Sequence, residues 1–149
     1  MDLQHFVGTK LVKSKAMSRL EYVSYRGWEL PADEEGSDKG YLVEYLDGGK
    51  PNHPDHEGYI SWSPKEQHEN AYLKMGNMGT YTPAQQKVFA EKVQLEHWIA
   101  RLKEDIRVHD KLKDTDDFIS TPWEVQLMQS QLSCLETCLN VVIERTEWF

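Results

Sequence analysis

The feature that most constrains the fold of this chain is a regular spacing of apolar residues in its C-terminal half. After Pro122 they recur at intervals that alternate between three and four, at Val125, Met128, Leu132, Leu135, Leu139 and Val142. An earlier series contains Val88, Leu95, Ile99, Leu102 and Ile106, and its last four members are spaced by four, three and four. Such spacing places apolar side chains along one face of a helix, as in a coiled coil or in two packed antiparallel helices.

Residues that start and separate helices agree with this pattern. Thr82-Pro83 and Thr121-Pro122 each supply an N-cap residue followed by proline at the first helical position. The segment 109–120 is rich in aspartate, and we expect it to form the connecting loop. The C-terminal half is therefore predicted to be a long antiparallel two-helix hairpin.

Further apolar residues of the hairpin lie off both series, at Phe89, Val93, Trp98, Leu127, Val141, Ile143, Trp148 and Phe149. A lone hairpin buries too little surface to offset the entropy of ordering it, so these side chains need a partner, either the N-terminal module or another chain. We expect a homo-oligomer, a dimer or a higher assembly such as a hexamer. Cys134 and Cys138 lie four apart on one helix, where they cannot easily bridge, and we expect reduced thiols buried as small apolar residues.

The N-terminal half predicts a small module of strands and short helices. Strands are expected at residues 6–13, 41–46 and 58–62, where aromatic and β-branched residues cluster. Ser18 and Glu21 have the spacing of a capping box, which predicts a short helix over residues 19–25 that stops at Gly27. A second helix is expected after Ser63 as N-cap and Pro64 at the first position.

The fold class that follows is α+β: a small antiparallel β-sheet module with short helices, then the two-helix hairpin. Residues 75–80 contain two glycines and no apolar periodicity, which marks the break between the halves. We assign residues 1–75 to the module, 76–81 to a linker and 82–149 to an oligomerising hairpin.

Charge and hydropathy limit the partners. The 149-residue chain has a formal net charge of −8, and it is evenly acidic, without the basic stripe that long nucleic acid requires. No apolar run approaches the roughly 18 residues that cross a bilayer. The N-terminus lacks the basic start and apolar stretch of a signal peptide, so we expect a cytoplasmic protein that uses neither a membrane nor long nucleic acid.

Signs of catalysis are weak. The chain has no Gly-x-Ser-x-Gly elbow, no phosphate loop and no dinucleotide fingerprint. The segment 52–57 contains His53, His56 and Glu57, and His68 follows it, which leaves a metal-dependent nucleotide hydrolase as an alternative. A solvated hairpin loop explains the same residues, and we expect no catalytic residues, metal ligands or cofactor.

Aromatic residues crowd the first half together with Arg19 and Arg26. Flat rings beside guanidinium groups suit a pocket that stacks a base and holds phosphate. A small tyrosine-rich core explains the same composition, and both interpretations stay open.

The motifs YRGWELP (25–31), GYLVEY (40–45) and GYISWSPK (58–65), with NHPDH (52–56) between the last two, resemble a family of small bacteriophage proteins. The similarity covers residues 5–73. Residues 82–147 are similar to the helical hairpin of phage anti-defence sponges, the Thoeris anti-defence sponge and the anti-CBASS sponge. It rests on Leu95, Ile99 and Leu102, an acidic loop, and a second helix that ends in Glu144-Arg145.

This resemblance implies sequestration in the host cytoplasm. Such sponges bind a cyclic ADP-ribose immune signal tightly without cleaving it, and related members hold cyclic oligonucleotides at sites formed by their oligomers. Chosen by chemistry, the ligand-binding candidates are Arg19, Arg26, Trp28, Tyr59, Trp62, Phe89 and Arg145. A structural salt bridge is an equal alternative for Arg145, and an inhibitor or adaptor of a host protein is the alternative function.

Overall fold

A computed structural model describes residues 3–115 and 121–149. The chain divides into two compact units, Met1–Tyr72 and Leu73–Phe149. The linker expected at residues 76–81 falls at the start of the second unit. Each unit has its own cluster of buried apolar residues.

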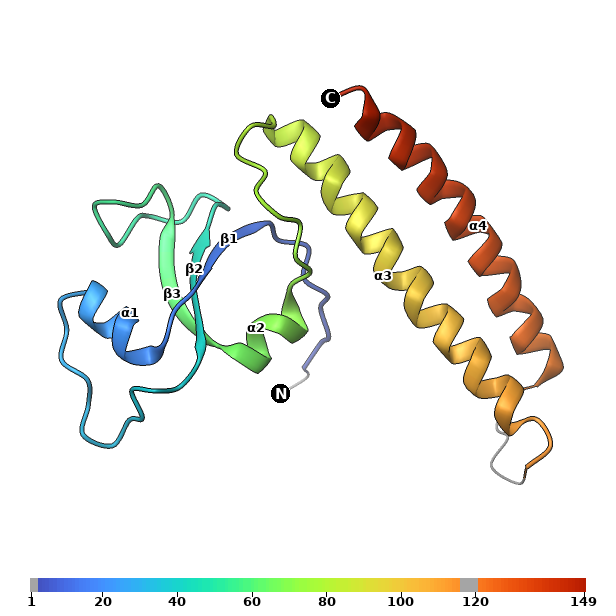
Figure 1. The fold of residues 1–149 in the computed structure, drawn as a ribbon, viewed down its shortest axis with the longest axis horizontal. Coiled ribbons are helices and arrows are strands. Elements are labelled where there is room, and N and C mark those ends of the chain that lie inside the picture. The colour runs from blue at the N-terminus through green and yellow to red at the C-terminus, as the bar shows by residue number, and fades with distance from the viewer. Residues whose placement is uncertain (1–2, 116–120) are drawn as a thin grey trace. The chain divides into compact units, whose positions relative to one another are not determined.

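The first unit contains a three-stranded antiparallel sheet and two short helices (Figure 1). The elements are β1 (Val12–Ala16), α1 (Arg19–Tyr25), β2 (Gly40–Tyr45), β3 (Tyr59–Pro64) and α2 (Lys65–Ala71). The strand order β1-β2-β3 makes β2 the central strand. The predicted α+β class with a small antiparallel sheet is confirmed.

The two short helices cover opposite faces of the sheet. Leu42 of β2 and Ile60 of β3 form a buried cluster with Tyr22 of α1. Tyr41, the neighbour of Leu42, instead stacks on His68 of α2, with ring centroids 4.0 Å apart. Because successive residues of a strand point to opposite faces, α1 and α2 pack on different sides.

Two details of the predicted module are wrong. The first strand is Val12–Ala16 rather than residues 6–13, because only the later residues pair with β2, from Val12 opposite Tyr45 to Ala16 opposite Tyr41. The apolar Phe6 has no such pairing and is 90% exposed. Secondly, β3 continues through Pro64, so Pro64 rather than Ser63 is the N-cap of α2, and no side chain caps that helix.

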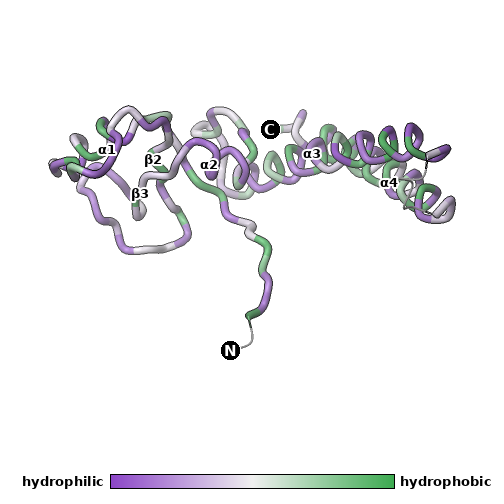
Figure 2. The backbone as a smooth tube through the Cα atoms, turned by 90° about the horizontal axis from the view of Figure 1, so that it is seen from below, coloured by the Kyte–Doolittle hydropathy of each residue, from purple (hydrophilic) through white to green (hydrophobic). Residues whose placement is uncertain are grey.

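The second unit is the predicted hairpin, formed by α3 (Pro83–Leu112) and α4 (Pro122–Glu147). The helices run in opposite directions side by side (Figure 1), and Val88 near the start of α3 packs with Val142 near the end of α4. Thr82 and Thr121 cap them as predicted. Hydrophobic and hydrophilic residues alternate in short runs along both helices, as expected for helices with one apolar face (Figure 2).

Two expectations for the hairpin need correction. The predicted loop over 109–120 starts too early, because α3 continues to Leu112, and residues 116–120 lie outside the described part of the chain. Cys134 and Cys138 are unpaired, as expected, but exposed rather than buried. They lie on a face of α4 different from the one that packs on α3, so the hairpin does not bury them.

No helix among the described residues combines the length and apolar character needed to span a membrane.

Candidate ligand-binding site

The C-terminal end of α1 positions the first pair of candidate residues. Arg26 is the C-cap, and Gly27 follows with a φ of 69°. The Gly27 N–H donates to Ser24 and the Trp28 N–H donates to Val23, at 3.0 and 2.9 Å. This is the Schellman arrangement, which requires a left-handed residue directly after the cap. Gly27 therefore turns the chain so that Trp28 comes back beside the helix end.

Arg26 and Trp28 form a stacked pair, which we call the Arg26–Trp28 platform. The Arg26 guanidinium carbon lies 4.3 Å from the centre of the Trp28 ring, and Trp28 is 56% exposed. Tyr22 meets Trp28 edge-on, with centroids 6.3 Å apart, and its hydroxyl lies 3.5 Å from Arg26 Nη1. A flat ring is thus held beside a guanidinium at the surface of the unit.

The guanidinium of Arg26 differs from that of Arg19 in its neighbours. Within residues 3–115 and 121–149, no carboxylate forms an ion pair with Arg26. Arg19 binds Glu34, with Nε and Nη2 each 2.6 Å from Glu34 Oε2. The donors that a phosphate would need are therefore largely occupied in Arg19 and available in Arg26.

Arg19 also packs over Trp62, 5.0 Å from its ring centre, but in acidic surroundings. The shallow depression that contains both residues is also lined by acidic side chains, Asp33, Glu34, Glu35 and Asp38. The Trp62 ring N–H is used within the fold, where it donates to the Met17 carbonyl at 2.9 Å. Like charges around this depression oppose the entry of a phosphate.

Tyr59 is partly exposed, at 47%, and its nearest aromatic partner is Tyr45, at a centroid distance of 6.4 Å. The two rings are neighbours because Tyr59 of β3 lies directly opposite Tyr45 of β2 in the sheet. Among the described residues, Tyr59 forms no hydrogen bond and no cation–π contact with Arg19 or Arg26, whose guanidinium groups lie over Trp62 and Trp28 instead.

The remaining candidates lie in the hairpin. Phe89 packs between Tyr81 and Phe149, with centroid distances of 4.7 and 5.8 Å. Arg145 pairs with Glu91 of α3 at 3.5 Å, which is the salt-bridge alternative weighed for this residue. Both are near the end of the hairpin where α3 begins and α4 ends.

The structure thus brings the candidates together in pairs rather than as one pocket. Arg26 with Trp28 and Arg19 with Trp62 are the two guanidinium–indole pairs among the described residues of the first unit. Of these, only the Arg26–Trp28 platform combines an exposed ring with an unpaired guanidinium.

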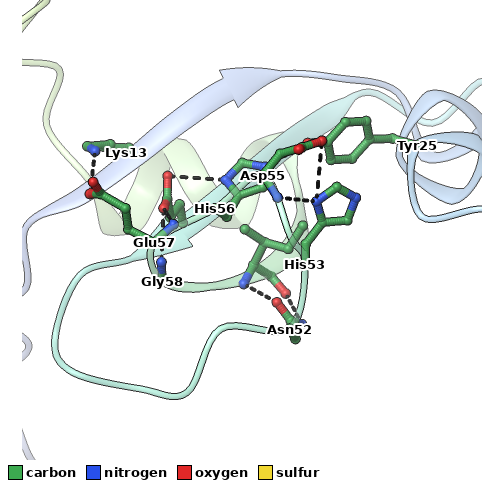
Figure 3. A network of polar contacts seen from close by, with 10 residues as sticks. Lys13, Tyr25, Asn52, His53, Asp55, His56, Glu57 and Gly58 are labelled. Atoms are coloured by element: carbon green, nitrogen blue, oxygen red, sulfur yellow. Dashed lines mark hydrogen bonds and ion pairs between the residues drawn. The ribbon is translucent and has the colours of Figure 1, made fainter.

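A polar network that the sequence did not reveal supports this end of α1 (Figure 3). The Tyr25 hydroxyl lies 2.9 Å from His56 Nε2, and His56 Nδ1 lies 3.2 Å from Glu44 Oε2. Because a carboxylate only accepts, Nδ1 donates to Glu44, and in the neutral imidazole Nε2 accepts from the Tyr25 hydroxyl. The Tyr25 ring also stacks on His53, at 4.6 Å. The loop is therefore attached to the helix residue directly before Arg26.

Glu44 is the buried anchor of this loop, with 7% of its surface exposed. Its Oε1 accepts from the N–H groups of Glu57 and Gly58, at 2.9 and 3.0 Å. Burial raises the pKa of Glu44, but the hydrogen bonds from Gly58, His56 and Glu57 outweigh it and bring the pKa below its usual value. The carboxylate is therefore held in its charged form.

The residues of the hydrolase alternative do not gather at one point: the rings of His53 and His56 lie edge to face, with centroids 5.5 Å apart, but the other two residues have different neighbours. His68 lies on the α2 side of the sheet, where its Nε2 is 2.8 Å from Ser14 Oγ, and Glu57 pairs with Lys13 at 3.6 Å. No group of three or more potential metal ligands occurs in the part of the chain that the structure describes.

Comparison with protein families, with curated proteins and with solved structures finds no match for this chain.

Proposed function

We propose that this protein is a non-enzymatic sponge that binds and sequesters a cyclic ADP-ribose-type or cyclic oligonucleotide immune signal. In this proposal it acts for a bacteriophage in the host cytoplasm, against Thoeris or CBASS signalling, and functions as a homo-oligomer. The motifs that resemble small phage proteins and the sponge-like hairpin suggest the biological setting. The Arg26–Trp28 platform is the observation that carries the chemistry.

The platform has the two groups that such a ligand needs. An exposed indole face stacks an adenine base, and stacking of this kind contributes about 1–3 kcal/mol per base. A guanidinium without a carboxylate partner offers several N–H donors to a diphosphate or a phosphodiester. Tyr22 fixes the edge of the indole, so less side-chain entropy is lost on binding.

The proposal is tested by incubating the purified protein with cyclic ADP-ribose isomers and with cyclic oligonucleotides. Ultrafiltration followed by mass spectrometry measures the ligand that remains free, and heating then releases the bound fraction. Depletion followed by recovery of the intact ligand supports sequestration. A cleaved product would instead indicate the hydrolase, and the absence of retention at micromolar protein would reject the ligand class.

Variants assign the site. Arg26→Gln is expected to weaken binding about tenfold or more, since a hydrogen bond to a charged group is worth about 1.5–3 kcal/mol. Trp28→Leu should weaken binding to a similar extent, because it removes the ring on which the base stacks. Arg19→Gln is the matched control, because its guanidinium is already paired with Glu34, and it should change the affinity by less than about threefold. A larger loss for Arg19→Gln than for Arg26→Gln would move the site to the depression beside Trp62.

A further inference from the structure

A second stripe of residues follows α4 on a side that α3 does not cover. We call it the α4 outer face, and it consists of Trp123, Leu127, Ser130, Cys134, Cys138 and Val141, all exposed. They recur every three or four residues, so they share one face of the helix. Leu127 and Val141 are 49% and 55% exposed. Between them, small side chains border a shallow depression that includes Cys134 and Cys138.

This face carries no charge over most of its length. Between Val125 and Ile143 the only charged residue is Glu136, and it is engaged with Lys103 of α3 at 2.7 Å. The whole chain has a net charge of −8, so two copies repel each other wherever their acidic surfaces meet. The α4 outer face is a surface along which two acidic copies can approach without that repulsion.

The order of residues on this face is complementary to itself. Leu127 and Val141 each lie seven residues from Cys134. If two copies of α4 pair antiparallel about a two-fold axis at Cys134, Leu127 of one copy meets Val141 of the other at both ends. Small residues occupy the centre, where the helix axes approach most closely.

The ends of the stripe are complementary as well. Trp123 and Arg145 each lie eleven residues from Cys134, so the same axis brings the guanidinium of one copy to the indole of the other. Among the described residues of its own chain, Arg145 forms one ion pair, with Glu91, and the two side chains are 52% and 49% exposed. Such exposed pairs contribute little to stability. Arg145 can therefore form a cation–π contact with Trp123 of the second copy across the interface.

We propose that the α4 outer face binds a second copy of this chain, with the two α4 helices antiparallel and Cys134 on the two-fold axis. This interface does not depend on the nucleotide proposal. It identifies the surface and the register through which the chain self-associates.

Single-cysteine cross-linking tests the register. Helix axes about 8–10 Å apart leave facing Cα atoms roughly 3.5–5.5 Å apart, which overlaps the about 4.4–6.8 Å that a disulfide spans. Cys138 of the two copies would be eight residues apart along the axis, about 12 Å. Mild copper–phenanthroline oxidation should therefore link the Cys138→Ser variant into a covalent dimer and leave the Cys134→Ser variant mainly monomeric on non-reducing gels. Equal linking of both, or preferential linking through Cys138, would overturn the proposed pairing.

Sedimentation velocity of the full chain tests the surface without relying on the thiols. Val141→Glu places a carboxylate against Leu127 of the second copy, and we expect dimerisation to weaken about tenfold or more. Val108→Glu is the matched control, since Val108 is also exposed, at 38%, but lies on α3, and it should leave the dimer intact. Circular dichroism checks that both variants keep their helices. A parent protein that stays monomeric at tens of micromolar, or a Val141→Glu variant that dimerises as the parent does, would overturn the interface.

Discussion

Gly27 determines where the Arg26–Trp28 platform lies, through its backbone alone. Its φ is 69°, and a Cβ added there would meet no atom within 4 Å. A side chain at this position therefore causes no steric clash, and its cost comes only from the left-handed conformation. This separates the effect of backbone strain from that of packing.

Gly27→Ala is expected to lower the free energy of unfolding of the first unit by about 1 kcal/mol. The substitution should also lower the affinity of any ligand that binds the platform, because relief of the strain moves Trp28 away from Arg26. Urea denaturation followed by tryptophan fluorescence measures the stability change. Gly8→Ala is the control, since Gly8 also has open space around its Cα but lacks a positive φ; an equal loss in both variants would contradict the argument.

Glu44 makes the folding stability of the first unit depend on pH. Its pKa is lowered, because the hydrogen bonds from Gly58, His56 and Glu57 outweigh the opposing effect of burial. A depressed carboxyl pKa means that the unfolded chain binds the proton more readily than the folded chain. The stabilisation is thus complete above the unfolded pKa, about 4.3, and is lost as the pH falls through the folded value.

Glu44→Gln is expected to destabilise the unit at pH 7 by about 1–3 kcal/mol, because an amide cannot accept from both backbone N–H groups and His56 as well. As the pH falls through the lowered pKa of the folded Glu44, the difference from the parent should shrink, since the parent carboxyl then becomes protonated. Thermal unfolding across pH 3–7 measures this convergence. Glu66→Gln on the exposed surface of α2 should give parallel curves, and a constant Glu44→Gln deficit at every pH would show that ionisation is not the cause.

At the scale of elements, α2 depends on its packing against the sheet more than on local signals. The helix has seven residues and no side-chain cap. It is held by the stack of His68 on Tyr41 and by the Tyr41 hydroxyl, which donates to Glu69 at 2.8 Å. His68 Nδ1 is buried and has no hydrogen-bond partner among the residues that the structure describes. A neutral ring tolerates this better than a charged one.

His68→Phe is expected to keep the ring stacked on Tyr41 and to remove the loss of folding stability that protonation of His68 causes at low pH. Burial lowers the pKa of His68, against the opposing charge of Glu69, so the unfolded chain takes up this proton first. Parent stability is then fully present above the unfolded pKa of about 6.5 and declines as the pH falls through the folded value. The Phe variant loses the hydrogen bond between His68 and Ser14, so we expect it to be no more stable than the parent at pH 7.5. By thermal unfolding it should gain stability relative to the parent as the pH falls to 5. A variant that loses stability between these pH values as steeply as the parent would contradict this role.

Elements with local signals were predictable from the sequence, and those that depend on pairing were not. The Ser18–Glu21 capping box and the Thr82 and Thr121 caps are short-range patterns, and the helices begin after them. The first strand was misplaced because residues 6–11 have the composition of a strand but no pairing partner. At Pro64 the edge position of β3 decided the outcome, since an edge strand tolerates a residue without an N–H.

The candidate site was predictable only in part, for the same reason. The sequence placed Arg26 and Trp28 on either side of Gly27, and this local turn brings them together. It did not indicate that Glu34, fifteen residues from Arg19, would occupy that guanidinium. Nor did it indicate that Glu44 and His56 would fasten the loop to Tyr25. Contacts across the loops of a sheet depend on register, which residue spacing alone does not supply.

At the scale of the whole molecule, the two units have separate cores. The first is built around Leu42 and Ile60, and the second around Val88, Leu95 and Val142. No residue belongs to both buried clusters. A change in one core therefore acts directly on the free energy of local opening of its own unit.

Core substitutions test this separation. Leu95 is 5% exposed, so Leu95→Ala is expected to destabilise the hairpin by about 2–5 kcal/mol and to speed amide exchange throughout α3 and α4. Ile60 is 1% exposed and belongs to the other core. Ile60→Val is expected to lower the stability of the first unit by about 0.5–1.5 kcal/mol and to speed amide exchange only in the sheet. Hydrogen exchange measured by mass spectrometry on peptides from each unit distinguishes the two patterns, with the exposed Val108→Ala as a control. If Leu95→Ala accelerated exchange in β2 as much as in α4, the units would unfold as one cooperative body. A ligand or a second copy bound to either unit would then stabilise both, whereas separate cores confine that stabilisation to the unit that is bound.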